Sequence, residues 1–443
     1  MKKVLFLAYL FPPIANSGTQ RPLKFAKYLA EYGWEPTIIT ASEFDGHHTD
    51  PGLVADLPDN VRVIRVPMRN EEIGKRIATL LGGGRLGKKV GDSVSWRLQA
   101  RRRSPDLYAS WQPTVLREAT RLLKETRFDA IYATGFPWTS LLIGAELSKT
   151  TGLPLVADFR DLWAGENLFR SERPPHEQEL ALERGVLESA TAVVTASVGI
   201  ARHLAATHPS VSEDKFVPIH NGFDATDFAQ APPRPSVKRF RIVFTGVWKD
   251  GYNPAELYDS IDWIRRSRAA LLDDVEVIAA GFTPGEAQRR GLSSYIDERG
   301  VVSHDEALSL MRSADILYLS HVDAERQWVV PGKLYEYLAS GSPVLALTHP
   351  DKETAKIIAK VGGGVALSPD DPGTLYRALE EACRTRKLAV PERNPEALAG
   401  FERRQLTGKL AAVLEESTIH VQMHHTALRI DAGSSTVFAT RSS

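Results

Sequence analysis

Residues 330–346 read VPGKLYEYLASGSPVLA, a helix signal that passes directly into a strand signal. Pro331 stands where a helix can begin, because its missing N–H costs nothing in the first turn. The turn-forming residues 340–343 end the helix, and the apolar run 344–347 has the length and composition of a buried strand. With the apolar run 316–319 upstream, the pattern is strand, helix, strand, which is the unit of a parallel sheet.

The same alternation of short apolar runs and helical patterns extends through most of the chain. It runs from residue 4 to residue 219, stops at the proline-rich stretch 231–235, and begins again at residue 242. Three prolines in those five residues make a stiff linker. We therefore expect an α/β fold of two Rossmann-like, doubly wound domains. In such sheets ligands bind at the carboxyl ends of the strands, and two facing sheets leave a cleft for a small molecule.

The composition of the 443 residues excludes several classes of protein. Lys plus Arg number 55 and Asp plus Glu number 55, so the formal net charge is zero, which argues against a nucleic-acid partner. The single cysteine, Cys383, excludes an internal disulfide and a cysteine-rich zinc site. The sequence holds no apolar run that approaches the length of a membrane-spanning helix. We expect a cytoplasmic protein, with the inner face of the membrane as the alternative location.

One stretch of the sequence, residues 85–103, is strongly basic. It holds seven Lys and Arg residues against the single acid Asp92, and apolar residues are interleaved among them. Such a segment can lie on an anionic membrane, which would make the protein a peripheral membrane protein. A solvated basic face, or a phosphate-rich ligand nearby, explains the same pattern.

The loop before the first helix carries residues suited to anion binding. Gly18 permits close approach of the backbone, Arg21 adds a positive charge, and Ser17 or Thr19 can cap the helix. Free N–H groups at a helix start attract an anion. A plain strand–helix turn explains the same loop.

Two further loops follow predicted strands. Asp158 and Asp161 flank Arg160, and this group forms either a self-contained ion-pair cluster or part of a functional site. The first strand of the second domain runs into Gly246 and Lys249. Gly246 lets a ligand approach the backbone, and Lys249 can reach a phosphate as a point charge, with a solvated loop lysine as the alternative.

The stretch 330–346 offers the most specific of these patterns. Backbone N–H groups and the helix dipole at Gly332 can hold a diphosphate, and Lys333 adds a positive charge. Glu336, one turn further along, is placed to accept the hydroxyls of a ribose. A surface ion pair of Lys333 and Glu336 would account for these two charges. It would not account for the Pro-Gly helix start together with the tight turn at residues 340–343.

At this stretch the chain resembles the retaining glycosyltransferases of family 4, which have the GT-B fold. Their recurrent phrase is close to P-S-K-L-x-E-Y-x-A-x-G-x-P-V, and residues 331–344 read P-G-K-L-Y-E-Y-L-A-S-G-S-P-V. The likeness continues through FPP at 11–13, DFRD at 158–161, HNGFD at 220–224 and VSHDEA at 302–307. The resemblance therefore covers nearly the whole chain.

The resemblance implies roles for individual residues. It implies that the donor is bound by Gly18, Arg21, Gly246, His304, Gly332, Leu334 and Glu336. It implies that Asp158, Arg160, Lys249 and Lys333 are catalytic residues. The charge on the leaving diphosphate would be stabilised by Lys249, Lys333, Arg21 and the helix start at Gly332. Within the motif, Glu336 would bind the nucleotide ribose, and Gly332 and Lys333 would lie at the diphosphate.

Two positions depart from the family pattern. Trp328 stands where the first acid of the family's E-x7-E pattern would fall, and Asp323 or Glu325 would then supply the sugar contact. Arg160 stands where many relatives carry a histidine.

The resemblance also divides the chain. It implies an N-terminal acceptor-side domain over residues 1–228 and a C-terminal nucleotide-sugar-binding domain over 229–396. A helix over 397–417 would cross back to the first domain. Residues 418–443 form a tail of unknown structure, in which residues 418–423 alternate like a strand.

The implied reaction is the transfer of a sugar from a nucleotide diphosphate sugar, foremost a UDP-sugar, to a hydroxyl group. The acceptor would be a glycan, a lipid-linked or a small-molecule acceptor, as in polysaccharide biosynthesis. The anomeric configuration would be retained, and no metal or other cofactor is expected. A nucleotide-sugar 2-epimerase of the same fold and a non-catalytic nucleotide-sugar-binding protein stay open as alternatives.

Overall fold

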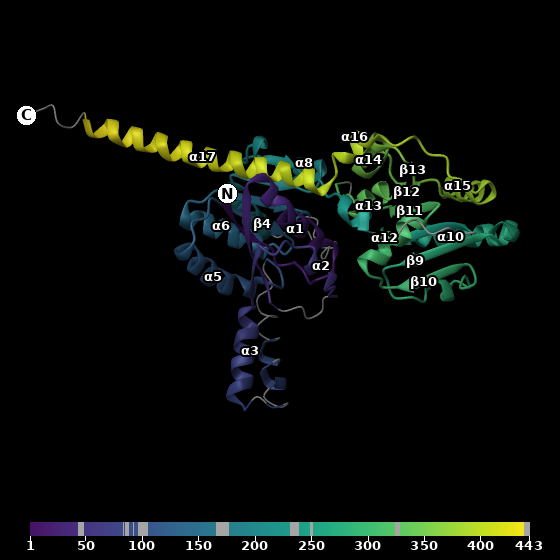
Figure 1. The fold of residues 1–443 in the computed structure, drawn as a ribbon, viewed down its shortest axis with the longest axis horizontal. Helices are drawn as coiled ribbons and strands as arrows, with labels where there is room; N and C mark the ends of the chain where they lie inside the picture. Colours follow the sequence, from purple (N-terminus) through teal and green to yellow (C-terminus); the bar gives the residue numbers. More distant parts are fainter. Residues whose placement is uncertain are drawn as a thin grey trace, which may run out of the picture. The chain divides into compact units, whose positions relative to one another are not determined.

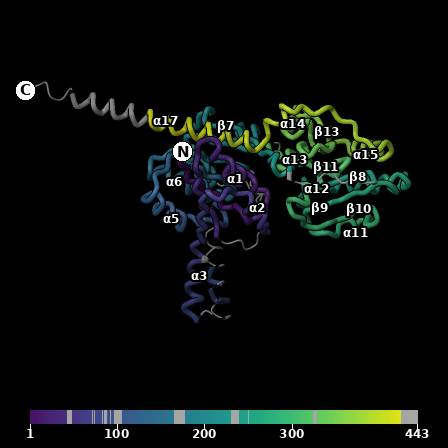
Figure 2. Tube along the Cα trace, viewed as in Figure 1, coloured from purple at the N-terminus to yellow at the C-terminus, as the bar shows by residue number. Residues whose placement is uncertain are grey.

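The computed structural model describes residues 1–42, 48–82, 84, 88–91, 93–95, 105–164, 177–230, 239–248, 251–323 and 328–437. The chain forms two compact units. Unit 1 consists of Met1–Ala196, Ile200–Ile219 and Thr407–Ser443, and unit 2 of Ser197–Gly199 and His220–Leu406. Each unit is built around one parallel sheet, as the ribbon in Figure 1 and the Cα trace in Figure 2 show.

The sheet of unit 1 has seven parallel strands in the order β3-β2-β1-β4-β5-β6-β7. The strands are β1 (Lys2–Leu7), β2 (Trp34–Ala41), β3 (Arg62–Val66), β4 (Ala130–Gly135), β5 (Leu155–Phe159), β6 (Ala192–Thr195) and β7 (Phe216–Pro218). Val4 to Leu7 of β1 are wholly buried, although their side chains alternate between the two faces of the sheet. Both faces are therefore covered, as in other parallel sheets whose crossover helices pack on either side.

Helices connect these strands. Those of unit 1 are α1 (Ser17–Tyr28), α2 (Gly52–Ala55), α3 (Arg69–Leu80), α5 (Gln112–Glu125), α6 (Thr139–Thr151), α7 (Glu177–Ser189) and α8 (Val198–Thr207), with short 3-10 helices η1 (Leu29–Tyr32), η2 (Ala109–Trp111) and η3 (Glu213–Lys215). The helical sequence patterns at 21–32, 111–125, 141–148, 177–188 and 199–206 predict α1, α5, α6, α7 and α8. No such pattern predicts α2 or α3.

The last helix, α17 (Arg403–Val437), belongs to unit 1 from Thr407 onward. Its buried residues Leu410 and Leu414 pack into unit 1, and Glu415 receives a 2.6 Å hydrogen bond from Lys2 Nζ at the start of β1. The strand-like alternation of residues 418–423 is misleading, because these residues continue α17. The Oγ1 atom of Thr418 donates instead to the carbonyl of Leu414, one helical turn back.

The sheet of unit 2 has six parallel strands in the order β10-β9-β8-β11-β12-β13. The strands are β8 (Phe240–Thr245), β9 (Val275–Ala280), β10 (Ile296–Gly300), β11 (Ile316–His321), β12 (Val344–Thr348) and β13 (Gly364–Leu367). The helices are α9 (Ala225–Gln230), α10 (Ala255–Arg268), η4 (Ala269–Leu272), α11 (Glu286–Arg289), α12 (His304–Ser313), α13 (Lys333–Ala339), α14 (Glu353–Val361), α15 (Pro372–Thr385) and α16 (Pro395–Ala399).

Two apolar cores lie on the two faces of this sheet. Ile242 and Phe244 of β8 belong to one core, and Val243 between them belongs to the other. This alternation follows from the two-residue repeat of a strand. One strand lies earlier in the sequence than expected. The apolar pair 301–302 predicts a strand, but the edge strand is Ile296–Gly300, and Val301 is 61% exposed.

The prediction of two Rossmann-like, doubly wound α/β domains is confirmed, since each unit is a parallel sheet with helical connections. Among the helices that the structure describes, none is long and apolar enough to cross a membrane.

Candidate functional site

The carboxyl edge of the sheet in unit 2 brings two glycine loops together. Gly246 follows β8 with a φ of +146°, and Gly281 follows β9 with a φ of +105°. A Cβ atom on Gly281 would lie 2.6 Å from the carbonyl oxygen of Gly246. Only glycine therefore fits this contact, and the backbone at the end of β8 is left without a side chain over it.

Lys333 reaches this edge from the start of α13. Its Nζ atom lies 2.8 Å from the point that a Cβ atom of Gly246 would occupy, and 3.8 Å from the ring centroid of Phe244. Burial lowers the pKa of the ammonium to about 7. Within the described ranges no carboxylate pairs with it, and the face of the Phe244 ring offers only a weak electrostatic partner. The site is therefore suited to a ligand that brings negative charge.

The other residues of the motif divide between surface and core. Gly332 has a φ of −55°, and a Cβ atom there would meet nothing within 4 Å. Leu334 is wholly buried in the apolar core, so its side chain cannot contact a donor. Glu336 is partly exposed in the first turn of α13. The hydroxyl of Tyr337 accepts a 2.8 Å hydrogen bond from the amide of Thr245, which fastens α13 to the end of β8.

One predicted site residue of the second domain, His304, lies apart from this group. His304 begins α12, and its Nε2 atom lies 3.4 Å from the carboxylate of Asp227 in α9. Lys249 lies outside the described residues, as does Glu325.

A buried lysine that the sequence analysis overlooks lies after the carboxyl end of β12. Lys352 is 1% exposed, and its ammonium donates to the carbonyl oxygen of Asp323. Burial lowers its pKa to about 8. The signal in the sequence is its place five residues after the end of the predicted buried strand 344–347. Trp328, the departure from the family pattern, packs against Gly199, where a Cβ atom would lie 2.6 Å from the tryptophan Cβ.

In unit 1, the start of α1 is capped by a residue other than those expected. Asn16, rather than Ser17 or Thr19, is the N-cap, and its side-chain oxygen accepts a 2.9 Å hydrogen bond from the amide of Gly18. A Cβ atom on Gly18 would lie 2.9 Å from the Arg160 guanidinium. A larger residue at this position would therefore displace the guanidinium.

Arg21 and Asp158 form a buried ion pair. Arg21 Nη2 lies 2.9 Å from Asp158 Oδ1, and the two side chains are 1% and 0% exposed. The second carboxylate oxygen also accepts hydrogen bonds from Tyr132 (2.6 Å) and Thr134 (2.9 Å). Burial by itself raises the pKa of Asp158, but the Arg21 guanidinium outweighs it and holds this pKa below its usual value. This geometry is that of a self-contained cluster, which joins α1 to β5.

Arg160 fastens the same loops by a different route. Its Nε atom donates to the carbonyl oxygen of Gly135 at 2.6 Å, and its two other nitrogens donate to the carbonyl oxygens of Gly18 and Phe136. Burial lowers the pKa of this guanidinium. Arg160 therefore fixes the backbone around Gly18. The structure brings Gly18, Arg21, Asp158 and Arg160 together in unit 1, and Gly246 and Lys333 together in unit 2.

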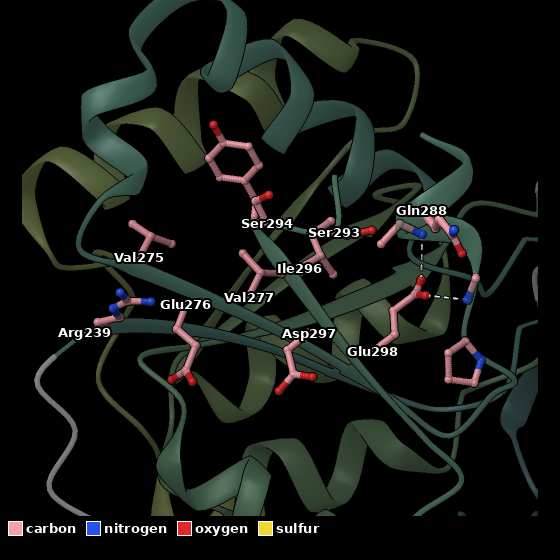
Figure 3. A pocket seen from close by; sticks show the side chains of 14 residues that line it. Arg239, Val275, Glu276, Val277, Gln288, Ser293, Ser294, Ile296, Asp297 and Glu298 are labelled. Carbon is pink, nitrogen blue, oxygen red and sulfur yellow. Dashed lines mark hydrogen bonds between the residues drawn. The ribbon is translucent and has the colours of Figure 1, made fainter. Parts of the chain in front are cut away.

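A pocket of about 490 Å³ lies elsewhere in unit 2, along the edge formed by β9 and β10 (Figure 3). One of its three acidic residues, Glu298, accepts hydrogen bonds from the amides of Gly285 (2.6 Å) and Ala287 (3.0 Å) and from the hydroxyl of Tyr258 (2.8 Å). The carboxylate of Glu298 thus satisfies two backbone N–H groups at the start of α11. The residues that line this pocket include none of the predicted site residues.

Comparisons with known proteins agree with this architecture. Residues 18–222 match the model of a family described as glycosyl transferase 4-like domain. No curated protein matches the chain. Among solved structures, sucrose-phosphate synthase from Thermosynechococcus elongatus has a TM-score of 0.58 at 14% identity, covering 98% of this chain and 100% of that one.

Two further solved structures are similar. WaaG, a glycosyltransferase involved in lipopolysaccharide biosynthesis, has a TM-score of 0.53 at 14% identity, covering 94% of this chain and 99% of that one. A protein described as a UDP-N-acetylglucosamine 2-epimerase from Listeria monocytogenes has a TM-score of 0.51 at 12% identity, with coverages of 94% and 96%. The expected GT-B fold is confirmed.

Proposed function

We propose that this GT-B-fold chain is a glycosyltransferase that moves a sugar from a nucleotide diphosphate sugar, foremost a UDP-sugar, to a hydroxyl group. The acceptor is a glycan, a lipid-linked or a small-molecule acceptor, and the anomeric configuration is retained without a metal ion. The glycosyl transferase 4-like domain at residues 18–222 supports the reaction class. Unit 2 supplies the groups that bind the donor.

The observation that carries this proposal is the Lys333 ammonium beside Gly246. This cation lies at a strand end, beside backbone that carries no side chain, and burial lowers its pKa to about 7. A bound anion stabilises the charged form of such a lysine. Perturbed titratable groups of this kind gather at functional sites. In parallel α/β sheets the ligand site lies at the carboxyl ends of the strands, which is where this lysine stands.

The chemistry requires stabilisation of a leaving diphosphate. As the bond between the sugar and the diphosphate breaks, negative charge grows on the diphosphate oxygens, and a preorganised cation stabilises that charge most where water is excluded. Lys333 supplies the cation. Glu336, partly exposed one turn further along α13, accepts hydrogen bonds from the two hydroxyls of the nucleotide ribose.

A nucleotide-sugar 2-epimerase is the second candidate, because the protein described as such an enzyme has a similar fold over 94% of this chain. Such an enzyme would also bind a nucleotide sugar through the carboxyl edge of unit 2. The two candidates differ in product, since an epimerase changes the sugar itself whereas a glycosyltransferase passes the sugar on unchanged.

The test is incubation of the purified protein with a panel of labelled nucleotide sugars, without and with candidate acceptor alcohols. We expect release of free nucleotide diphosphate and slow hydrolysis of the donor. Lys333→Met should lower this release by about a hundredfold, as loss of one group that stabilises transition-state charge does. The matched control is Lys356→Met, an exposed lysine of α14, which should leave the release unchanged.

Three outcomes would contradict the proposal. Equal release by the two lysine variants would remove Lys333 from the site. Recovery of a 2-epimer of the sugar would favour the epimerase. Tight donor binding without release under any acceptor would favour a binding protein.

A further inference from the structure

The end of helix α3 carries the most exposed large apolar side chain among the described residues. Leu80 is 85% exposed and its neighbour Leu81 is 56% exposed. Figure 1 shows α3 standing out from the sheet of unit 1, and its carboxyl end, where these leucines lie, is the end farther from the sheet. Single exposed apolar side chains are ordinary on a protein surface. Two adjacent ones at the end of a projecting helix indicate a site of interaction with another molecule.

The chain returns beside α3 after this end. The Nδ2 atom of Asn70, at the base of α3, donates to Oγ of Ser95 at 3.1 Å. Residues 88–91 and 93–95 are helical, and residues 88–90 stand in the sequence between the far end of α3 and Ser95 at its base. Val90 there is 37% exposed. We name Leu80, Leu81 and residues 88–90 the α3 tip.

Positive charge surrounds the α3 tip. Lys88 and Lys89 are exposed at the tip, and Lys75 and Arg76 are exposed on α3 itself. In sequence, residues 73–103 hold nine Lys and Arg residues and one acid, a surplus of eight positive charges in a chain whose net charge is zero. A basic surplus thus falls in the stretch of sequence that also exposes the leucines.

We propose that the α3 tip docks on an anionic lipid surface. The leucines enter the boundary between the headgroups and the acyl chains, and the lysines and arginines bind the lipid phosphates. Apolar side chains among cations fit this partner. A nucleic acid would use the cations but would leave Leu80 and Leu81 in water, since single strands are bound by aromatic stacking and duplexes by contacts to phosphates and base edges. The inference goes beyond the proposed reaction and does not depend on it.

The test is flotation of the full-length protein with vesicles of phosphatidylcholine, with and without phosphatidylglycerol. We expect binding only when phosphatidylglycerol is present, and weaker binding as salt shortens the range of the charges. The double variant L80S/L81S should weaken vesicle binding roughly tenfold or more, because two leucines no longer leave water. The double variant K88E/K89E should weaken it by at least about fivefold for each cation lost.

Two matched controls lie in unit 2. Val301→Ser removes an exposed apolar side chain (61% exposed), and Lys387→Glu reverses an exposed charge, and neither should change vesicle binding. All variants are at exposed positions, and unchanged thermal unfolding midpoints would show that they fold. The proposal is overturned if vesicle binding by the wild-type protein does not depend on phosphatidylglycerol. It is also overturned if the α3 tip variants bind vesicles as well as the control variants do. A third result would assign the α3 tip to nucleic acid. In that case the protein binds duplex DNA or RNA but not vesicles, K88E/K89E abolishes this binding, and L80S/L81S keeps it.

Discussion

The Nζ atom of Lys333 lies 2.8 Å from the point where a Cβ atom would stand at Gly246. Gly246→Ala must therefore displace the ammonium, and the alanine must also adopt a φ of +146°, at a cost of about 1–3 kcal/mol. We expect donor affinity and turnover to fall by about tenfold or more, measured by calorimetry and by release of nucleotide diphosphate.

Gly185→Ala is the control for this change. Gly185 lies in α7, outside the proposed donor site, and its Cβ position is open. This variant should keep both donor affinity and turnover. If Gly246→Ala behaves like Gly185→Ala, Lys333 and Gly246 do not form a ligand site together.

The fold follows from the sequence because each strand is an apolar run buried on both faces. The apolar run Val4–Leu7 predicts a strand buried on both faces. The apolar run that contains Ile242, Val243 and Phe244 likewise predicts a strand whose side chains enter two cores. Two features are not readable in this way. The edge strand Ile296–Gly300 reads IDERG, with three consecutive charged residues after Ile296, so it gives no apolar run. Residues 418–423 have the period of a strand, but side-chain hydrogen bonding and burial of Thr418 continue the helix.

The candidate site is readable in part. The motif marks Lys333 and the end of a predicted strand marks Gly246, but only the structure shows that these two residues meet. Sequence reasoning assigns Leu334 to the donor, although its side chain faces the core, because a motif records which residues recur and not where each points. Lys352 is missed because a lysine gives no apolar signal of its burial, which arises from contacts distant in sequence such as that with Asp323.

Donor binding should depend on pH through Lys333. Burial lowers the pKa of this lysine to about 7, so its charged form disappears as the pH rises above that value. An anionic diphosphate favours the charged form and raises the pKa in the complex. Donor affinity should therefore fall above about pH 7, by up to about tenfold per pH unit until the pKa of the complex is passed.

The measurement is the donor dissociation constant across this pH range. Lys333→Arg is the control, because arginine stays charged throughout. Its affinity should be nearly flat with pH. A wild-type profile as flat as that of the arginine variant would show that Lys333 does not meet the donor.

Glu336→Ala should weaken binding of the nucleotide itself as well as of the nucleotide sugar, because a ribose contact belongs to both. Loss of hydrogen bonds to a charged group, at about 1.5–3 kcal/mol each, corresponds to tenfold or more in affinity. Calorimetry with UDP alone separates this role from a contact to the sugar. Glu381→Ala, an exposed acid of α15, should change neither affinity, and a Glu336→Ala variant with full UDP affinity would exclude the ribose contact.

Removal of divalent metal should leave donor turnover unchanged. In the proposed reaction, Lys333 neutralises the charge on the leaving diphosphate, which is the role that a bound cation has in metal-dependent transferases. The measurement is the rate of nucleotide release after treatment with a chelator and again after magnesium or manganese is restored. A loss of rate with chelator that either ion reverses would contradict the metal-independent reaction.

The buried pair of Arg21 and Asp158 leads to a prediction about stability instead of chemistry. Asp158→Asn would leave the 1% exposed guanidinium of Arg21 without a counter-charge, which costs about 3–5 kcal/mol. Urea unfolding should show this loss near neutral pH. Because Arg21 holds the pKa of Asp158 below its usual value, the stabilisation is complete above the unfolded-state pKa of about 4 and disappears as the pH falls through the folded-state pKa. The difference between wild type and variant should therefore shrink in acid.

Asp262→Asn is the matched control for this pair, because Asp262 pairs with Arg265 and Arg266 on the surface of α10. Surface pairs contribute about 0–1 kcal/mol, so this variant should unfold close to wild type. Donor turnover decides between the two interpretations of Asp158. A residue that only holds α1 to β5 should lower turnover in proportion to the folded fraction. A fully folded Asp158→Asn variant with wild-type stability and abolished turnover would make the carboxylate part of the reaction and would contradict its role as the partner of Arg21 alone.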